Sequence, residues 1–180
     1  MNWQAAARAA RRVALVADSH GRVLPEVLAG LVGVDLIVHA GDVGGAQVLE
    51  ALETVAPVLA VSGNNDLPTR WPAAERARLA ALSASAVLPL TGGLLAVEHG
   101  HRFAAVATRH ARLRAAHADA RWVLYGHSHR CVVDADATPW VLNPGACGAA
   151  RAYGGAGWLE LRRVGRDWQV WSSREAAQSR

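Results

Sequence analysis

The chain has 180 residues, of which 52% are hydrophobic and 19% are charged, and this balance favours one globular domain over a disordered chain. Its basic residues, all arginines, give a net charge of +4 and are scattered along the sequence, so a nucleic-acid partner is not expected. No apolar segment reaches the roughly 20 residues that a membrane-spanning helix requires, so a membrane is not expected as a partner either.

The first segment, residues 1–12, is rich in alanine and arginine and lacks acidic residues, and we expect an N-terminal extension that could be flexible. A single domain is predicted over residues 13–180. The apolar run at 13–17 is too short for the core of a signal peptide. Because the two cysteines, Cys131 and Cys147, do not make a disulfide framework, we predict a cytoplasmic protein with reduced thiols.

Three strand–loop–helix units are predicted in the first part of the chain. Each begins with a predicted strand, at residues 13–17, 35–40 and 58–61. The first of these is a continuous apolar run, as in a parallel strand that is covered on both faces. A glycine-containing loop follows each strand and carries a polar residue, namely Asp18, Asp42 and Asn64. Asp42 follows Asp18 by 24 residues and Asn64 follows Asp42 by 22, so each step is close to one strand–helix unit. The three loops should therefore share the sheet edge at which open α/β sheets bind ligands.

The rest of the chain predicts a second sheet. A helix at 72–83 is followed by a hairpin at 86–97, a helix at 103–117 and a strand at 122–125. Four further strands are expected at residues 131–133, 140–142, 157–161 and 168–171. This order favours an α/β architecture with one sheet formed by strand–helix units, one formed by hairpins, and helices outside both.

Two histidine pairs follow predicted strands of this second sheet. His99 and His101 are two residues apart, as are His127 and His129, so in an extended backbone both side chains of a pair point to the same side. Neutral imidazole is a common metal ligand. The polar residues of the earlier loops also have an ordinary interpretation, because aspartate and asparagine are frequent in turns and at helix starts.

The joint pattern is harder to explain by turns alone. Seven candidate metal ligands lie in five loops that follow strands: Asp18, His20, Asp42, Asn64, His99, His127 and His129. Asp42 can bridge two cations with its two oxygens. His127 and His129, the histidines latest in the chain among these candidates, can each complete one of the two sites. Mixed oxygen and imidazole ligands suit manganese, iron, zinc or nickel. Such a pair of ions activates water and stabilises the charge that develops when a phosphate ester is hydrolysed.

These five blocks, in this order, resemble the calcineurin-like metallophosphoesterase superfamily. The resemblance extends from Asp18 to about Gly145, and the short chain with Asn143-Pro144-Gly145 is similar to the small bacterial and archaeal phosphodiesterase branch. It implies an α/β fold, a four-layer α/β/β/α sandwich with two mixed sheets. It also implies a first metal held by Asp18, His20, Asp42 and His129, and a second held by Asp42, Asn64, His99 and His127.

The resemblance further implies a metal-dependent phosphoesterase. Its substrates would be small phosphodiesters, with monoesters as the alternative, and its nucleophile would be a hydroxide that bridges two divalent ions. Manganese is the first expectation for these ions, with iron, zinc and nickel as alternatives. Because two small sheets with exposed edges favour self-association, a homodimer is also considered.

Three residues are candidates for a catalytic role beside the metals. Asn64 matches a residue that can touch the substrate phosphate, and Asp66 matches the carboxylate that supports an acid histidine in the protein-phosphatase members. In this sequence Asn65 stands where those members have that histidine. An amide cannot transfer a proton at neutral pH, so esters with good leaving groups should be the better substrates. His101 is a candidate substitute donor, and the alternative is that it only supports the ligands or the fold.

A different class of function is a non-catalytic scaffold of the same fold that keeps a metal site and binds a protein partner. By resemblance, the eukaryotic trafficking member of the superfamily represents this alternative. Such scaffolds tend to lose late histidines, whereas His99, His127 and His129 are all present in this sequence. The complete set of ligands therefore favours an enzyme.

Overall fold

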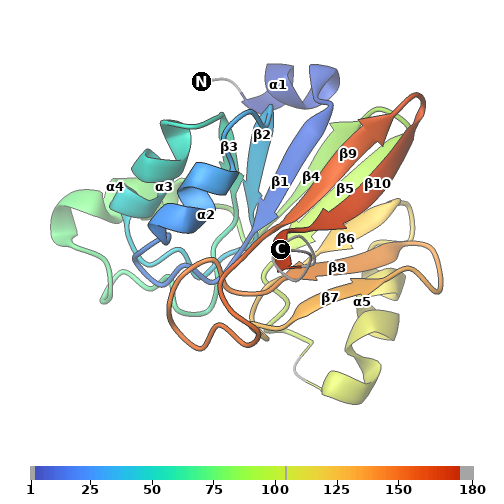
Figure 1. Cartoon of the computed structure of the whole chain (residues 1–180). Helices are drawn as coiled ribbons and strands as arrows, with labels where there is room; N and C mark the ends of the chain where they lie inside the picture. The colour runs from blue at the N-terminus through green and yellow to red at the C-terminus, as the bar shows by residue number, and fades with distance from the viewer. Residues whose placement is uncertain (1–2, 104, 175–180) are drawn as a thin grey trace.

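The computed structural model describes residues 3–103 and 105–174, and its centre is a pair of five-stranded sheets that face each other (Figure 1). The strands of the first sheet lie in the order β10-β9-β1-β2-β3. They are β1 (Arg12–Val16), β2 (Leu36–His39), β3 (Val58–Ala60), β9 (Leu159–Val164) and β10 (Asp167–Ser172). β1, β2 and β3 are parallel, whereas β9 and β10 are antiparallel to their neighbours.

The second sheet has the order β4-β5-β6-β8-β7. Its strands are β4 (Ser85–Leu90), β5 (Gly93–Glu98), β6 (Trp122–Leu124), β7 (Cys131–Asp134) and β8 (Trp140–Pro144). β5, β6 and β8 are parallel, and β4 and β7 form antiparallel edges. Both sheets are therefore mixed, as predicted.

Residues of β1 show why the sheets are covered on both faces. Val13 and Leu15 belong to the core cluster between the two sheets, whereas Ala14 and Val16 pack against the helices outside the first sheet. All four side chains are fully buried. Alternate residues of a strand point to opposite faces, so a strand between two apolar layers must be apolar throughout.

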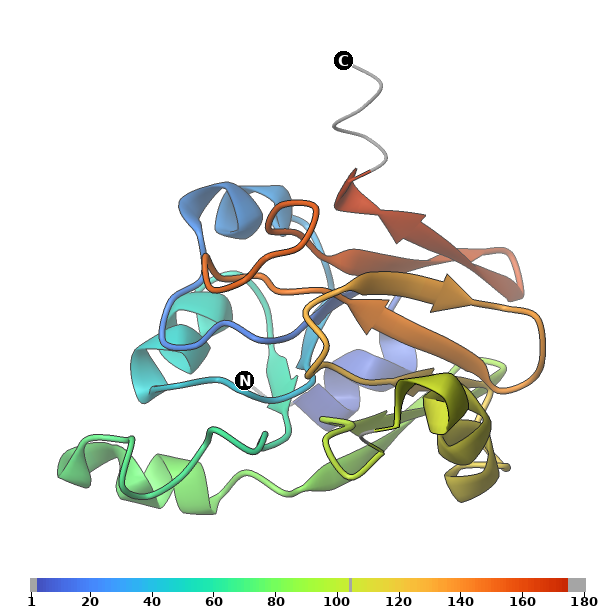
Figure 2. The same cartoon turned by 90° about the horizontal axis from the view of Figure 1, so that it is seen from below.

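Helices complete the outer layers (Figure 2). α2 (Pro25–Gly30) and α3 (Ala46–Glu53) pack on the outer face of the first sheet, and Leu49 and Leu52 are buried there. α5 (Arg109–Ala116) covers the second sheet through the buried Leu113. The predicted four-layer α/β/β/α sandwich is confirmed.

Two helices are shorter than predicted. The segment expected to be helical over 72–83 forms η1 (Ala73–Glu75) and α4 (Arg76–Ala80), and the segment at 103–117 forms η2 (Val106–Thr108) before α5. Leu79 is the buried residue of α4, and most helical stability in proteins comes from packing of an apolar face. Among the described residues, no helix combines the length and apolar character needed to span a membrane.

The segment at 1–12, expected to be an extension that could be flexible, contains a helix, α1 (Trp3–Ala9), from its third residue onward. Ala7 and Ala10 are each 1% exposed and belong to the cluster between the sheets. Alanine has a high helix propensity and a side chain small enough for close packing, which explains why this segment is part of the fold. Residues 1 and 2 of the predicted extension, and residues 104 and 175–180 of the predicted domain, lie outside the described part of the chain.

Candidate metal centre

Backbone hydrogen bonds join the loops at the carboxyl ends of the parallel strands. The N–H of Asp18 donates to the carbonyl of Gly41 at 3.0 Å, and the N–H of His20 donates to that of Asp42 at 3.0 Å. Between the loops of the second sheet, the N–H of Gly126 donates to the carbonyl of His99 at 3.1 Å. These bonds hold the loops in contact, so the side chains that they carry are placed close together.

The backbone at this edge is strained. Within the described residues, six non-glycine residues have a positive φ, and five of them are predicted metal ligands: Asp18, His20, Asp42, His127 and His129, with φ between 47° and 65°. The sixth, Arg151, belongs to a neighbouring loop. A left-handed conformation is uncommon for residues with a side chain and costs of the order of 1–3 kcal/mol. Strain concentrated in this way is typical of a functional site.

Four of the predicted ligands form one cluster. The ligand atoms of Asp18, His20, Asp42 and His129 all lie within 4.8 Å of one another. The Nε2 atoms of His20 and His129 are 3.1 Å apart, and His129 Nε2 is 3.5 Å from Asp18 Oδ1. His20 Nε2 is 3.7 Å from Asp42 Oδ2. These four residues are the set that the resemblance assigns to the first metal, and their donor atoms point to a common centre.

A second pair of histidines also meets at Asp42. His99 Nε2 is 3.3 Å from Asp42 Oδ2, and the ring centroid of His127 is 5.3 Å from that of His99. Asp42 thus contacts both the first cluster and this histidine pair, as a ligand shared by two cations would.

Main-chain carbonyls orient two of the histidines. The Nδ1–H of His99 donates to Ala40 at 2.8 Å, and the Nδ1–H of His129 donates to Ala150 at 2.8 Å. Each bond fixes the proton on Nδ1, so the lone pair of Nε2 can coordinate a metal. A hydrogen bond of this kind is the usual support of a histidine ligand.

The loop after β3 approaches Asp42 closely through its main chain. The N–H of Asn65 donates to Asp42 Oδ1 at 2.8 Å, and its side-chain amide donates to Oδ2 at 2.6 Å. A Cβ on Gly63 would lie 2.2 Å from Asp42 Oδ1, so this approach requires glycine. Asn64 lies between these two residues with an exposed side chain, at the rim of the site. The sequence suggested only that Asn65 lacks a proton to transfer, and the structure shows that it holds the central carboxylate.

Asp66 is occupied by hydrogen bonds within the loops. Its carboxylate accepts the N–H groups of Val43 at 3.1 Å, Gly44 at 2.9 Å and Gly63 at 2.8 Å, and the indole N–H of Trp71 at 3.2 Å. Asp66 is only 7% exposed. It therefore joins the loops that follow β2 and β3, and through them it positions Asp42.

His101, the other catalytic candidate, lies at the edge of the site. Its ring centroid is 5.6 Å from that of His99 and 6.3 Å from that of His127, and its side chain is exposed. Its ring therefore lies beside two of the candidate ligands and is open to solvent.

The unpartnered atoms and the electrostatics of the site fit a divalent cation. Two buried atoms have no hydrogen-bond partner among the described residues at this site, Asp18 Oδ2 and His99 Nε2, and both belong to predicted ligands. Burial raises the pKa of Asp18 to about 7 and lowers the pKa of His127 to about 4. Burial also raises the pKa of Asp42, but the nearby His99 ring and the hydrogen bonds from Asn65 outweigh it and hold that pKa well below its usual range. Burial lowers the pKa of His99, but the neighbouring Asp42 outweighs it and raises that pKa. A carboxylate kept ionised among several imidazoles is a donor set that suits a divalent metal.

His39 supports the site in a way that sequence reasoning missed. It is the last residue of β2, fully buried, and its Nδ1 accepts the N–H of Gly41 at 3.2 Å. Its Nε2–H donates to Ser19 Oγ at 2.8 Å, and the Ser19 hydroxyl donates to the carbonyl of Val43 at 3.0 Å. Burial lowers the pKa of His39 to about 4, so the ring is neutral. The sequence signal that could have indicated this role is a histidine near the end of a mostly apolar predicted strand.

Asn143 shapes the loop that carries the last histidine pair. Its side-chain amide donates to the carbonyl of Gly126 at 2.7 Å and to Ser128 Oγ at 3.1 Å, and its Oδ1 accepts the N–H of Gly145 at 2.8 Å. It is fully buried. The asparagine thus holds the backbone on either side of His127, whereas the rings themselves are oriented by other groups.

Comparison with known proteins identifies the family through its sequence model. Residues 12–161 match the model of the calcineurin-like phosphoesterase superfamily domain. No curated protein matches the sequence.

Solved structures with a similar fold include three proteins of different origin. A predicted phosphoesterase from Streptococcus pneumoniae is 22% identical with a TM-score of 0.65, and the match covers 92% of this chain and 91% of that one. An archaeal phosphodiesterase is 20% identical with a TM-score of 0.66, covering 89% and 99%. Vps29 from Entamoeba histolytica, in complex with Zn²⁺, is 14% identical with a TM-score of 0.68, covering 89% and 98%. All three identities are low, and the similarity concerns the fold.

Proposed function

The chain belongs to the calcineurin-like phosphoesterase superfamily, and from this premise we propose that it is a metal-dependent hydrolase of small phosphodiesters. The observation that carries the proposal is the cluster of Asp18, His20, Asp42 and His129, whose donor atoms lie within 4.8 Å of one another on a strained backbone. The buried Asp18 oxygen without a hydrogen-bond partner among the described residues is the second support, because a cation would satisfy it.

Two divalent ions fit this arrangement of donors. The first would be held by Asp18, His20, Asp42 and His129, and the second by Asp42, Asn64, His99 and His127. When bound, such ions lower the pKa of a water molecule and neutralise the charge on a phosphoryl group. Manganese is the metal that we propose first for these oxygen and imidazole donors, and iron, zinc and nickel suit the same ligands.

The chain's own residues then have distinct tasks. Asn65 holds the Asp42 carboxylate by two hydrogen bonds, and Asp66 holds the surrounding loops by four, so both are positioning residues. Asn64 is exposed, and in this proposal its amide N–H donates to a phosphate oxygen. His101 is the residue that we propose donates a proton to the departing oxygen.

The openness of the site supports a diester as substrate. Asn64 and His101 are exposed, and His20 and His127 are half-buried. A diester carries a group on each side of its phosphorus, so it needs space on both sides of the metal centre. A site that is open at Asn64 and at His101 provides this space.

Hydrolysis of bis(p-nitrophenyl) phosphate with Mn²⁺ tests the proposal. Asp42→Asn should lower the rate at least about hundredfold, because even the loss of an outer hydrogen bond to a metal ligand costs 10–100-fold. Arg121→Gln is the matched control, since Arg121 precedes β6 at the opposite end of the sheet and should leave the rate unchanged. Near-normal hydrolysis by the Asp42→Asn protein would overturn the mechanism. Binding of Mn²⁺ without hydrolysis of any phosphate ester would favour the alternative, a metal-binding scaffold.

The proton donor is tested by comparing leaving groups. An aryl oxide departs without a proton, whereas an alkoxide needs one, and a general acid contributes about 10²–10⁴-fold. His101→Asn should therefore slow hydrolysis of alkyl diesters about hundredfold and leave aryl diesters nearly unaffected. An equal loss on both substrates would contradict the assigned role.

A further inference from the structure

A pocket of about 410 Å³ opens beside the candidate metal centre. It shares His127 with that centre, because this residue lines the pocket while its ring lies 5.3 Å from that of His99. The pocket's polar and aromatic walls come from Arg109, His110, Tyr125, Arg130 and Tyr153. A substrate whose phosphoryl group lies at the metals could therefore extend one of its ester groups directly into this pocket.

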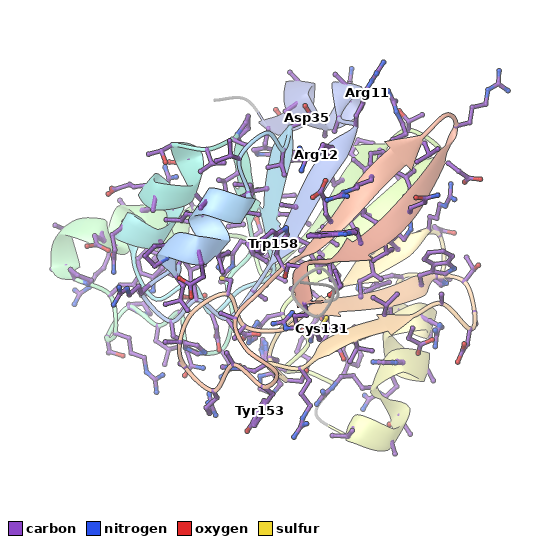
Figure 3. All side chains as sticks on the ribbon, in the orientation of Figure 1. Arg11, Arg12, Asp35, Cys131, Tyr153 and Trp158 are labelled. Atoms are coloured by element: carbon purple, nitrogen blue, oxygen red, sulfur yellow. The ribbon has the colours of Figure 1, made fainter. Side chains whose placement is uncertain are left out.

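The outer wall is an arginine lying over an aromatic ring. The Arg130 guanidinium carbon is 4.4 Å from the centroid of Tyr153, and the two backbones pair in an isolated bridge. Among the described residues, Arg130 has no carboxylate partner. Tyr153 is 49% exposed and lies at the outer end of the loop that follows β8 (Figure 3). This pair presents a flat surface and an unneutralised positive charge.

The inner wall is held rigidly. The Nδ1–H of His110 donates to Asp134 at 2.5 Å, and its Nε2 accepts the hydroxyl of Tyr125 at 3.0 Å. Arg109 donates from Nε to the carbonyl of Phe103 at 2.8 Å, with its guanidinium 5.9 Å from the centre of the Tyr125 ring. Side chains fixed in this way lose little conformational freedom when a ligand binds.

The chemistry of the walls selects the ligand. Two arginines line the pocket, and none of its described lining residues is a carboxylate, so a negatively charged group is favoured. Tyrosine and arginine faces stack on planar rings. The volume is within the range of small-molecule sites.

We propose that this pocket binds one ester group of the substrate and that this group is nucleotide-like, a planar aromatic ring with a negatively charged substituent. The inference rests on the proposed function, since it places the phosphoryl group at the metal centre. The inference adds to the proposed function by assigning Tyr153 and Arg130 as the residues that determine which diester is bound.

Calorimetric titration of the full chain tests the pocket separately from catalysis. The probes are adenosine 5′-monophosphate and ribose 5-phosphate, which share the phosphate and differ in the ring, and each is titrated in EDTA and again with Mn²⁺. Stacking of a base on an aromatic side chain is typically worth about tenfold or more in affinity, so the adenosine compound should bind about tenfold more tightly under both conditions.

Tyr153→Ala and Arg130→Gln should each reduce the ratio of the two affinities towards one, and both variants should keep the circular dichroism spectrum of the wild-type protein. Arg121→Gln is the control, because Arg121 also lies over an aromatic ring, 4.6 Å from that of Trp122, outside the pocket. Equal binding of the two probes by the wild-type protein would overturn the inference even if hydrolysis proceeds. A ring preference that depends on Tyr153 and Arg130 in a protein without hydrolase activity would support the pocket and refute the proposed function instead.

Discussion

Asp42→Asn should remove the stabilisation that manganese confers on the fold. The side chain is buried, with Oδ2 3.3 Å from His99 Nε2 and 3.7 Å from His20 Nε2, so it faces both groups of candidate ligands. The substitution keeps the shape of the side chain and replaces a charged oxygen by an amide nitrogen. The remaining amide oxygen is uncharged and can coordinate only one cation, so the two sites no longer share a ligand.

The size of the effect follows from linkage. A ligand that binds only the folded state stabilises it by about 2.7 kcal/mol when its concentration is a hundred times its Kd. For a chain of 180 residues, each kcal/mol corresponds to roughly 2–4 °C in Tm, so manganese should raise the Tm of the wild-type protein by roughly 5–11 °C. In the Asp42→Asn protein the rise should be below about 2 °C.

Thermal unfolding followed by circular dichroism over a series of MnCl₂ concentrations measures this difference. Asp134→Asn is the control, because it removes a carboxylate that is bound to Arg114 and His110 and lies outside the candidate ligands. Its starting Tm can differ, but its manganese-dependent rise should equal that of the wild-type protein. An equal rise in the Asp42→Asn protein would show that Asp42 is not a shared ligand, and the two-metal reasoning would then be wrong.

Three further substitutions test the surroundings of the site. Gly63→Ala places a methyl group 2.2 Å from Asp42 Oδ1 and should weaken Mn²⁺ binding about tenfold or more in a calorimetric titration. An unchanged affinity for Mn²⁺ would show that the loop can move to accommodate the methyl group. Asp66→Asn turns an N–H group towards two of the four donors and should lower the free energy of unfolding by about 2–3 kcal/mol in urea, and a loss below about 0.5 kcal/mol would contradict its role in joining the loops. The hydrogen bond from Arg114 lowers the pKa of Asp134 to about 2, below the unfolded value of about 3.9. Asp134 therefore stabilises the fold by about 2 kcal/mol above pH 4, and this contribution is lost as the pH falls from about 4 to 2. The stability difference between wild type and Asp134→Asn should shrink over that window, and a constant difference would be evidence against the assigned cause.

Sequence alone determined the layers and the sheet edge at which the candidate ligands lie. The apolar run 13–17 and the mostly apolar segment 35–40 are long enough only for strands, and their lack of alternation requires cover on both faces, which leads to helices outside paired sheets. Polar residues at the ends of those runs, Asp18 and Asp42, must then lie at one edge. Both conclusions depend on short-range patterns, and such patterns are visible in a linear sequence.

The contacts between loops were decided by the tertiary structure. Which late histidine joins Asp18 and His20 depends on how the two sheets pack, and it is the donor atoms of His129 that lie with theirs. The bonds from Asn65 to Asp42 and the contact between Arg130 and Tyr153 also join segments whose spacing carries no information about distance. The same holds for the positive φ values of the ligands, because backbone strain of this kind persists only when the surrounding fold enforces it.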